Sequence, residues 1–246
     1  MERASYALAA EVENTHWWFR GRREILRAAI VRALAGAPRP AHLLEAGCGN
    51  GGNLPLLAEF GRVSAFELDD VARERAVARR MAVVARGSLP DDIPFAPGEF
   101  DLVAALDVVE HVDDDRAAIL GLAARVRPGG CLLLTVPAFR WLWSEHDDIT
   151  HHRRRYTAAE IKALFRGAGL ATEHLSYFNT LLFPLAAAHI KLRRLLRLDP
   201  YSAFRTPPRW QNEVLASVFA LERGLAPRFR LPFGISLLGW ARKPAA

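Results

Sequence analysis

The sequence contains little cysteine and little lysine. Its two cysteines, Cys48 and Cys131, both fall within apolar stretches, so the chain offers neither a disulfide framework nor a cysteine-rich zinc module. Lysine supplies three of the 33 basic residues, and the rest are arginine. The formal net charge of +6 is modest, and no helix-turn-helix, zinc-finger or RNA-binding signature accompanies it. We therefore predict no nucleic-acid partner and attribute the arginine excess to genome base composition.

Two further absences bear on location. The chain opens without the basic and then apolar segment of a cleavable leader, which together with the cysteine usage predicts a protein of the reducing cytoplasm. The largely apolar stretch 178–190 is interrupted by Pro184 and is shorter than the roughly 20 residues of a membrane-spanning helix. No membrane span is expected there.

The overall composition is that of a globular protein. Hydrophobic residues make up 51% of the chain and charged residues 24%, which suits a large buried core. The length of 246 residues fits one domain better than two. We divide it into an N-terminal helical cap (1–40), a core (41–178), an apolar and basic helical insertion (179–234) and a last strand with its tail (235–246).

Short apolar runs alternate with helical patterns from residue 41 onward. Runs at 42–47, 62–68, 81–86, 100–106 and 131–137 predict five strands, and 171–178 and 236–242 predict two more. An amphipathic helix is expected at 20–34, after the aromatic cluster at 16–19. The alternation predicts an α/β fold with a mostly parallel, seven-stranded sheet and helices on both faces.

The strongest motif follows the first predicted strand. It consists of Glu45, Gly47, Cys48, Gly49, Gly51 and Asn53. Glycines at such a strand-to-helix turn allow a sharp bend and let a ligand approach bare backbone. Glu67 ends the next strand, where a carboxylate can accept hydrogen bonds from both hydroxyls of a ribose. The two features together indicate a nucleoside-containing cofactor.

This pattern resembles the class I methyltransferases that use S-adenosylmethionine. The Glu-x-Gly-x-Gly-x-Gly form differs from the Gly-x-Gly-x-x-Gly of nicotinamide enzymes, and residues 100–103 and 127–130 match further family motifs in the right order. The resemblance covers about residues 41–137 and implies a Rossmann-like fold. It also implies that Glu45 orients the methionine end of S-adenosylmethionine, that the glycine loop lines this cofactor, and that Glu67 and Leu68 lie beside the ribose.

The segment after the third strand departs from the family pattern. The family usually offers an acid to the adenine amino group there, whereas this chain has Gly87, Ser88 and Leu89. Ser88 can accept a hydrogen bond, and Asp91 is an alternative. We place Ser88 and Leu89 beside the adenine.

The acceptor side requires a group that can remove a proton. Asp107, Glu110 and His111 follow the fourth strand, whose end faces the cofactor in this fold, and Asp107 is expected to reach the cofactor too. An imidazole titrates near neutrality, so His111 suits this role. The spacing is also typical of a helix-capping box, which we favour. It further resembles the Asp/Glu-x-x-Glu-His of some quinone-biosynthesis O-methyltransferases that bind a divalent cation, but we predict no metal.

A second polar cluster occupies residues 143–156. Thr157 and Glu160 predict a capping box for the next helix, but the preceding histidines, arginines and aromatic rings exceed what a cap requires. The cluster resembles bacterial methyltransferases with unassigned acceptors, often associated with glycan and polyprenyl-lipid assembly. We predict catalytic roles for Asp107, His111, His146 and His152. We predict acceptor contacts from Trp18, Trp143, Asp147, Arg154 and Tyr156.

These features predict methyl transfer, most simply O-methylation, to a small-molecule or lipid-linked acceptor between the N-terminal aromatic helix and the 141–156 loop. One alternative is an RNA or protein methyltransferase, although the chain lacks an Asn/Asp-Pro-Pro-Tyr motif. Another is a cofactor-binding partner protein without catalysis. The cofactor motif is intact, with Glu45, Glu67 and three glycines, which argues against a protein that has kept the fold and lost the chemistry.

The segment 178–198 leaves two interpretations open. Its apolar half is followed at once by Lys191, Arg193, Arg194 and Arg197. A stretch of this length is most often a buried helix. Alternatively, its leucines enter a headgroup layer while the cations meet anionic lipid, which would make the protein peripheral at the inner face of the membrane.

Overall fold

A single seven-stranded sheet organises the computed structural model, which describes residues 8, 10–196 and 206–245, without the side chains of 193–196. The strands are β1 (Ala41–Ala46), β2 (Gly61–Glu67), β3 (Val83–Arg86), β4 (Phe100–Leu106), β5 (Val126–Pro137), β6 (Ala171–Phe178) and β7 (Ser236–Arg242). Their order is β3-β2-β1-β4-β5-β7-β6. β1 to β5 are parallel, and β7 is antiparallel to both of its neighbours. The predicted Rossmann-like sheet is confirmed.

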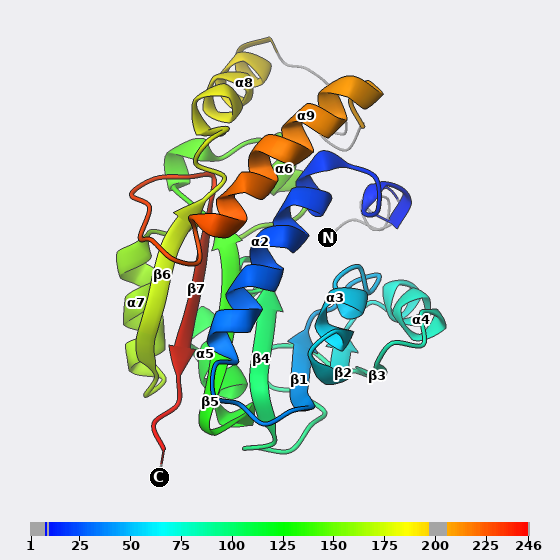
Figure 1. Cartoon of the computed structure of the whole chain (residues 1–246), viewed down its shortest axis with the longest axis vertical. Helices are drawn as coiled ribbons and strands as arrows, with labels where there is room; N and C mark the ends of the chain where they lie inside the picture. The colour runs from blue at the N-terminus through cyan, green and yellow to red at the C-terminus, as the bar shows by residue number, and fades with distance from the viewer. Residues whose placement is uncertain (1–7, 9, 197–205, 246) are drawn as a thin grey trace.

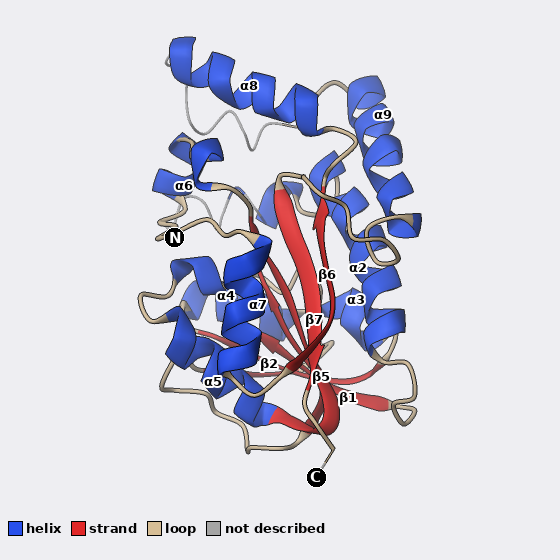
Figure 2. Cartoon of the chain, turned by 90° about the vertical axis from the view of Figure 1, so that its left-hand side faces the viewer, coloured by secondary structure: helices blue, strands red, loops and turns tan. Residues whose placement is uncertain are grey.

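Helices cover both faces of the sheet (Figure 2). α2 (Trp17–Ala33), α3 (Leu54–Ala58) and α4 (Asp70–Ala78) share one core with the sheet, and α5 (Asp115–Arg125) and α7 (Ala158–Gly167) share the other. α6 (Glu145–Ile149) and α8 (Phe183–Leu196) lie beyond the carboxyl ends of the parallel strands, and α9 (Arg209–Ala220) packs along α2 (Figure 1). Short 3₁₀ turns occur at η1 (Val109–His111), η2 (Arg140–Leu142) and η4 (Leu221–Gly224).

The N-terminal helix begins earlier than its apolar pattern indicates. Its first residue is Trp17 and not Arg20, because the His16 side chain accepts a hydrogen bond from the Trp18 backbone N–H and caps the helix there. The aromatic residues at 17–19 therefore belong to α2. Capping is correctly predicted for α7, where Thr157 and Glu160 form the capping box.

The cap and the insertion form one layer, although they are far apart in the sequence. Phe219 of α9 is fully buried against α2, where a Cβ on Gly21 would lie 2.6 Å from its ring. The Asn212 side chain accepts from the Trp17 N–H at 2.8 Å and donates to the Thr15 carbonyl at 2.8 Å. These contacts fix the entry of α2 over the sheet.

Two predicted features differ in the structure. The fifth strand begins at Val126 and not at Cys131 as its apolar run predicts, because β4 and β5 pair on both sides of an irregularity between Phe100 and Leu102. The buried-helix interpretation of 178–198 is wrong for the described part of α8, since Leu185 is 63% exposed and Leu192 53%. The side chains of 193–196 and all of Arg197 lie outside the described residues.

Candidate active site

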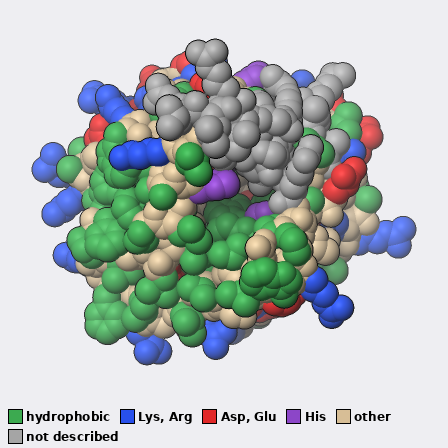
Figure 3. Space-filling view, turned by 90° about the horizontal axis from the view of Figure 1, so that it is seen from above, with side chains coloured by type: hydrophobic (Ala, Val, Ile, Leu, Met, Phe, Trp, Pro, Cys, Tyr) green, Lys and Arg blue, Asp and Glu red, His purple; other side chains and the backbone are tan. Residues whose placement is uncertain are grey.

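A cavity of about 800 Å³ lies at the carboxyl ends of the parallel strands. Its walls come from the loops after β1, β2, β3 and β4, from residues 12–23, from residues 144–155 and from α8. Seen from above, the molecule is hollowed here, with hydrophobic side chains inside and histidine at the rim (Figure 3). The volume is at the upper end for ligand pockets and suits a cofactor together with an acceptor.

The glycine loop forms the floor below α2. Gly47 and Gly49 adopt φ values of +62° and +55°, a backbone region that side chains rarely occupy. A Cβ on Gly47 would lie 2.9 Å from the Val108 side chain, so this position has no room for one. Gly47, Cys48, Gly49 and Asn53, for which cofactor contacts were predicted, all line the cavity, whereas Gly51 packs against Leu54 and Arg79 beneath it.

Glu67 holds the loop in this shape. Its Oε2 accepts from the Gly49 N–H at 2.7 Å, and its Oε1 accepts from the N–H groups of Leu68 and Asp69 at 2.9 and 3.0 Å. The side chain lines the cavity. One carboxylate therefore links the ends of β1 and β2, and its oxygens have capacity for further donors from a ligand.

Glu45 is a buried carboxyl with an incomplete set of partners. It is 1% exposed, its Oε1 accepts from Asn53 Nδ2 at 2.9 Å, and its Oε2 has no hydrogen-bond partner among the described residues. Burial raises the pKa of this carboxyl to about 7. Glu45 is not among the lining residues, but its partner Asn53 is, so the orphaned oxygen lies one side chain behind the cavity wall and fits the cationic end of a bound S-adenosylmethionine.

The segment that was predicted to contact the adenine lies in the cavity wall. Ser88 and Leu89 line it together with Leu68. The Ser88 N–H donates to the Asp92 carbonyl at 2.7 Å, and the Asp92 N–H donates back to the Ser88 carbonyl at 3.1 Å, which turns the segment sharply. Asp91, the alternative to Ser88, is exposed and is not among the lining residues.

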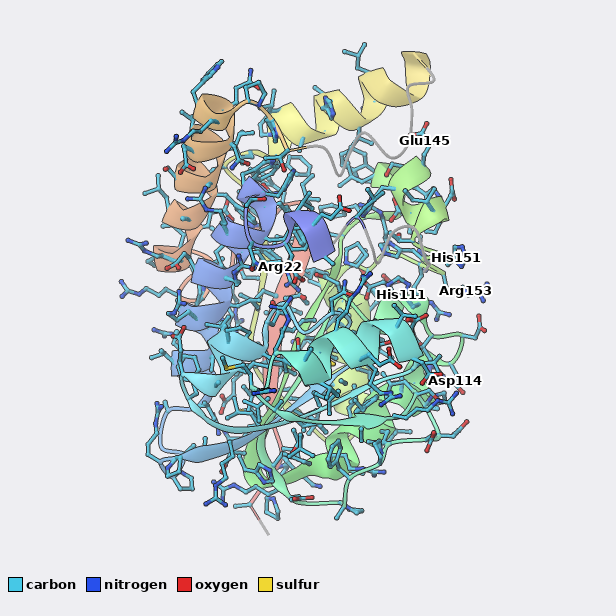
Figure 4. The ribbon with its side chains drawn as sticks, turned by 90° about the vertical axis from the view of Figure 1, so that its right-hand side faces the viewer. Arg22, His111, Asp114, Glu145, His151 and Arg153 are labelled. Atoms are coloured by element: carbon cyan, nitrogen blue, oxygen red, sulfur yellow. The ribbon has the colours of Figure 1, made fainter. Side chains whose placement is uncertain are left out.

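Sequence reasoning missed Arg22. This residue of α2 is 4% exposed, and its guanidinium donates to Asp107 Oδ2 at 2.6 Å and to Thr135 Oγ1 at 2.9 Å. It lies over the Trp18 ring at 5.1 Å and lines the cavity. Figure 4 labels Arg22 on α2. The sequence does carry one indication that Arg22 is buried: it falls on the apolar face of α2, three residues before Ile25.

The capping-box interpretation of Asp107 and Glu110 is wrong. Asp107 has a φ of +61°, which turns its carboxylate toward Arg22, and η1 starts after Val108 without a side-chain cap. Glu110 is fully buried, lines the cavity, and has no hydrogen-bond partner for either carboxyl oxygen among the described residues. Burial, and then the Asp107 charge, raise the pKa of Glu110 well above its usual value.

Asp147 holds His152 at the cavity wall. Asp147 is fully buried, and its Oδ1 lies 2.8 Å from His152 Nδ1. Arg155 donates to both carboxylate oxygens at 2.8 Å, and the Ser144 N–H donates to Oδ2 at 2.8 Å. Burial alone would raise the pKa of Asp147, but the bonds from His152 and Arg155 hold it well below its usual range. An ionised carboxylate only accepts hydrogen bonds, so His152 Nδ1 donates to Asp147, and Nε2 is the ring nitrogen left to accept a proton from a ligand.

His111 lies beside His152 in the cavity wall. Its ring centroid lies 4.7 Å from that of His152. Burial, reinforced by the neighbouring His152, lowers the pKa of His111 to about 3, so His111 is a weak base. Ligand atoms of Glu110, His111 and His152 all lie within 4.8 Å of one another, so these three residues could hold a metal ion. Asp107, the first residue of the motif, is not in that group.

The other predicted acceptor residues divide into two groups. Trp18 lines the cavity, as does His146, for which a catalytic role was predicted, whereas Asp147 is not among the lining residues. Trp143, Arg154 and Tyr156 are not among the lining residues: the Trp143 Nε1–H donates to Asp148, and Arg154 and the Tyr156 hydroxyl both contact Asp115. Figure 4 shows their neighbours His151 and Arg153 at the outer edge.

The segment before α2 lies against the glycine loop. Glu13 is 5% exposed and forms an ion pair with Arg79, whose Nε donates to the Asn50 carbonyl at 2.6 Å. A Cβ on Gly52 would lie 2.4 Å from Glu13 Oε2. The segment thus forms a wall of the cofactor side of the cavity, a function that its polar sequence does not predict.

Comparison with known proteins agrees with this geometry. A methyltransferase-domain family model matches residues 18–175. The chain is 30% identical over 176 residues, 70% of its length, to a probable S-adenosylmethionine-dependent methyltransferase of Mycolicibacterium smegmatis. It is 33% identical over 155 residues, 55% of its length, to a ubiquinone biosynthesis O-methyltransferase of Xanthomonas euvesicatoria. The matches span 65% of the length of each relative.

Solved structures show the same fold. The methyltransferase in a complex with the Haloferax volcanii Trm112 activator superposes with a TM-score of 0.62 at 20% identity, covering 99% of this chain and 96% of that one. A geranyl diphosphate methyltransferase with bound substrate and sinefungin gives 0.56 at 15% identity, covering 88% and 76%. With a family match over more than half its length, a glycine loop between two acidic residues and this sheet, the chain belongs to the class I, S-adenosylmethionine-dependent methyltransferases.

Proposed function

We propose that the protein transfers the methyl group of S-adenosylmethionine to an oxygen of a small-molecule or lipid-linked acceptor. The observation that carries this proposal is the pairing of His152, which lines the same cavity as the glycine loop, with the buried Asp147 behind it. When bound, S-adenosylmethionine supplies an electrophilic methyl group. The names of the relatives support O-methylation, since several are ubiquinone biosynthesis O-methyltransferases.

The cofactor would rest on the glycine loop. Glu67 would accept from the ribose hydroxyls, Ser88 and Leu89 would contact the adenine, and Glu45 would attract the ammonium group of the methionine end. Arg22, which sequence analysis overlooked, lies in the cavity wall where it can bind the carboxylate of that methionine. Its Nε has no partner among the described residues, which fits a further acceptor.

The acceptor would lie between Trp18 and the 144–155 segment. His152 Nε2 can take the hydroxyl proton while Asp147 holds the ring and stabilises the imidazolium that forms. The low pKa of His111 leaves it uncharged beside this imidazolium, so it adds no repulsion. Glu110, whose pKa is raised by burial, can donate a hydrogen bond to the acceptor oxygen when it is protonated.

A labelling experiment tests the acceptor class. Cell extract is incubated with the protein and with S-adenosylmethionine labelled on its methyl group, then separated into lipid, small-molecule, protein and nucleic-acid fractions. We expect label in the lipid or small-molecule fraction, and alkali-stable label in the isolated product would agree with an ether. Label confined to protein or RNA would instead support the alternative acceptors, and label in no fraction would support a non-catalytic cofactor-binding protein.

Glu67→Ala should weaken S-adenosylmethionine binding by several-fold to a hundredfold. The change removes hydrogen bonds to a charged acceptor, worth about 1.5–3 kcal/mol each. Calorimetric titration measures the effect, and thermal unfolding without ligand reports loss of the Glu67 contact with the loop. Asp70→Ala, at an exposed acid three residues away, is the control and should bind normally. Equal affinities for the two variants would remove Glu67 from the cofactor site.

The affinity for S-adenosylmethionine should rise with pH through about 7. Glu45 has a raised pKa of about 7, so its attractive carboxylate form is depleted below that pH and predominates above it. Between pH 8 and pH 6 the dissociation constant should increase by up to about tenfold per unit below the pKa. The same titration with Glu45→Gln should show weaker binding and a flatter profile. A pH dependence identical in both proteins would assign it to another group.

His152→Ala should lower kcat by about 10²–10⁴ while cofactor affinity survives, as expected for loss of a general base. The labelled acceptor identified in the extract provides the assay. His151→Asn is a matched control, because His151 is the exposed neighbour and Asn tolerates its positive φ of 58°. If a chelator abolishes activity and magnesium restores it, the Glu110–His111–His152 cluster holds a metal and the base assignment fails.

A further inference from the structure

An exposed apolar face surrounds the start of α8. We call it the α8 face and define it by Trp141, Leu181, Leu185, Lys191 and Leu192. The apolar members are 54%, 45%, 63% and 53% exposed, and Lys191 is exposed too. Figures 1 and 2 both place α8 at the outer end of the molecule, beyond the strands. Large apolar side chains that are exposed together on one helix indicate an interaction surface and not a defect in packing.

The helix is fixed at its first residue. Phe183 contacts the rings of Trp141 and Phe233, with centroid distances of 6.0 and 5.3 Å. Just before it, Leu182 is buried and the Leu181 N–H donates to the buried Glu222 at 2.8 Å. The chain is therefore anchored in the core up to residue 183, and α8 projects outward from that anchor.

Charge identifies the kind of partner. No acidic residue occurs between Glu173 and Asp199, whereas Lys191, Arg193, Arg194 and Arg197 all fall in this interval. The Lys191 ammonium lies 5.5 Å from the Trp141 ring centroid, so a cation and an interfacial aromatic sit together on the face. Exposed leucines, a tryptophan and an excess of cations match the headgroup boundary of an anionic bilayer. No described helix is long and apolar enough to cross that bilayer.

The same helix borders the cavity. His189 and Ile190 of α8 line it, while Leu185 and Leu192 are exposed. We propose that the α8 face docks on an anionic bilayer and brings the acceptor end of the cavity to the lipid surface. The docking stands on the surface alone, and only its use for a lipid-linked acceptor rests on the proposed function.

Vesicle flotation tests the docking. The purified full chain is mixed with vesicles of phosphatidylcholine alone, or of phosphatidylcholine with phosphatidylglycerol, at low and high salt. We expect flotation with the anionic vesicles at low salt, and loss of binding with neutral vesicles or at high salt, where headgroup attraction is screened. Absence of flotation with anionic vesicles at low salt would overturn the proposal.

Matched variants locate the contact. Leu185→Gln with Leu192→Gln should reduce binding by about tenfold or more, because both side chains lose their apolar contact with lipid. Val214→Gln with Leu221→Gln is the control, since these residues are 54% and 63% exposed elsewhere on the insertion. Brominated lipid should quench the wild-type tryptophan fluorescence more than that of Trp141→Phe. Equal flotation of the two double variants, or equal quenching, would overturn the assignment to α8.

Two further measurements separate membrane docking from the proposed methyl transfer and from self-association of the chain. Cofactor affinity measured by calorimetry should be the same in both double variants, so failure of docking and failure of methyl transfer are distinguishable. Light scattering gives the mass of the chain without lipid. A dimer that only Leu185→Gln with Leu192→Gln dissociates would assign the face to a second copy and overturn the membrane proposal.

Discussion

The ion pair between Arg22 and Asp107 joins the N-terminal helix to the carboxyl end of β4, and the cavity depends on it. Arg22 is almost fully buried, and a buried guanidinium is tolerated only with a partner. Asp107 supplies the charge and Thr135 of β5 a further acceptor. Since α9 packs on α2, this ion pair acts together with the Asn212 and Phe219 contacts that join the insertion to the helix.

A fully buried carboxylate organises the acceptor side in a similar way. Asp147 binds Arg155, His152 and the Ser144 backbone, so a loop rich in polar residues acquires a fixed shape. The carboxylates of Asp107 and Asp147 fix different parts of the chain. Asp107 fixes a helix from another part of the chain, whereas Asp147 fixes its own loop and aims one imidazole at the cavity.

The fold and the cofactor side could be predicted because their signals are local. Strand periodicity and a glycine loop between two acids depend on neighbouring residues, so the seven strands and the lining by Gly47, Gly49 and Glu67 follow from the sequence. The predicted cap at Asp107 failed because its true partner, Arg22, lies 85 positions earlier. The separation of Asp147 from the cavity, and the wall built by Glu13, likewise depend on packing between distant segments that no spacing rule reveals.

The order of the strands has a consequence for how the protein is made. β7 lies between β5 and β6 but is synthesised after both, and α9, the partner of α2, also follows the core in the chain. On a ribosome, the glycine loop and β1 to β5 can therefore pair while β6 has no neighbour. Ser236 and Ile235 line the cavity, so its acceptor end closes only when these late residues arrive. A nascent chain could therefore form the cofactor-binding glycine loop well before the acceptor end of the cavity is enclosed.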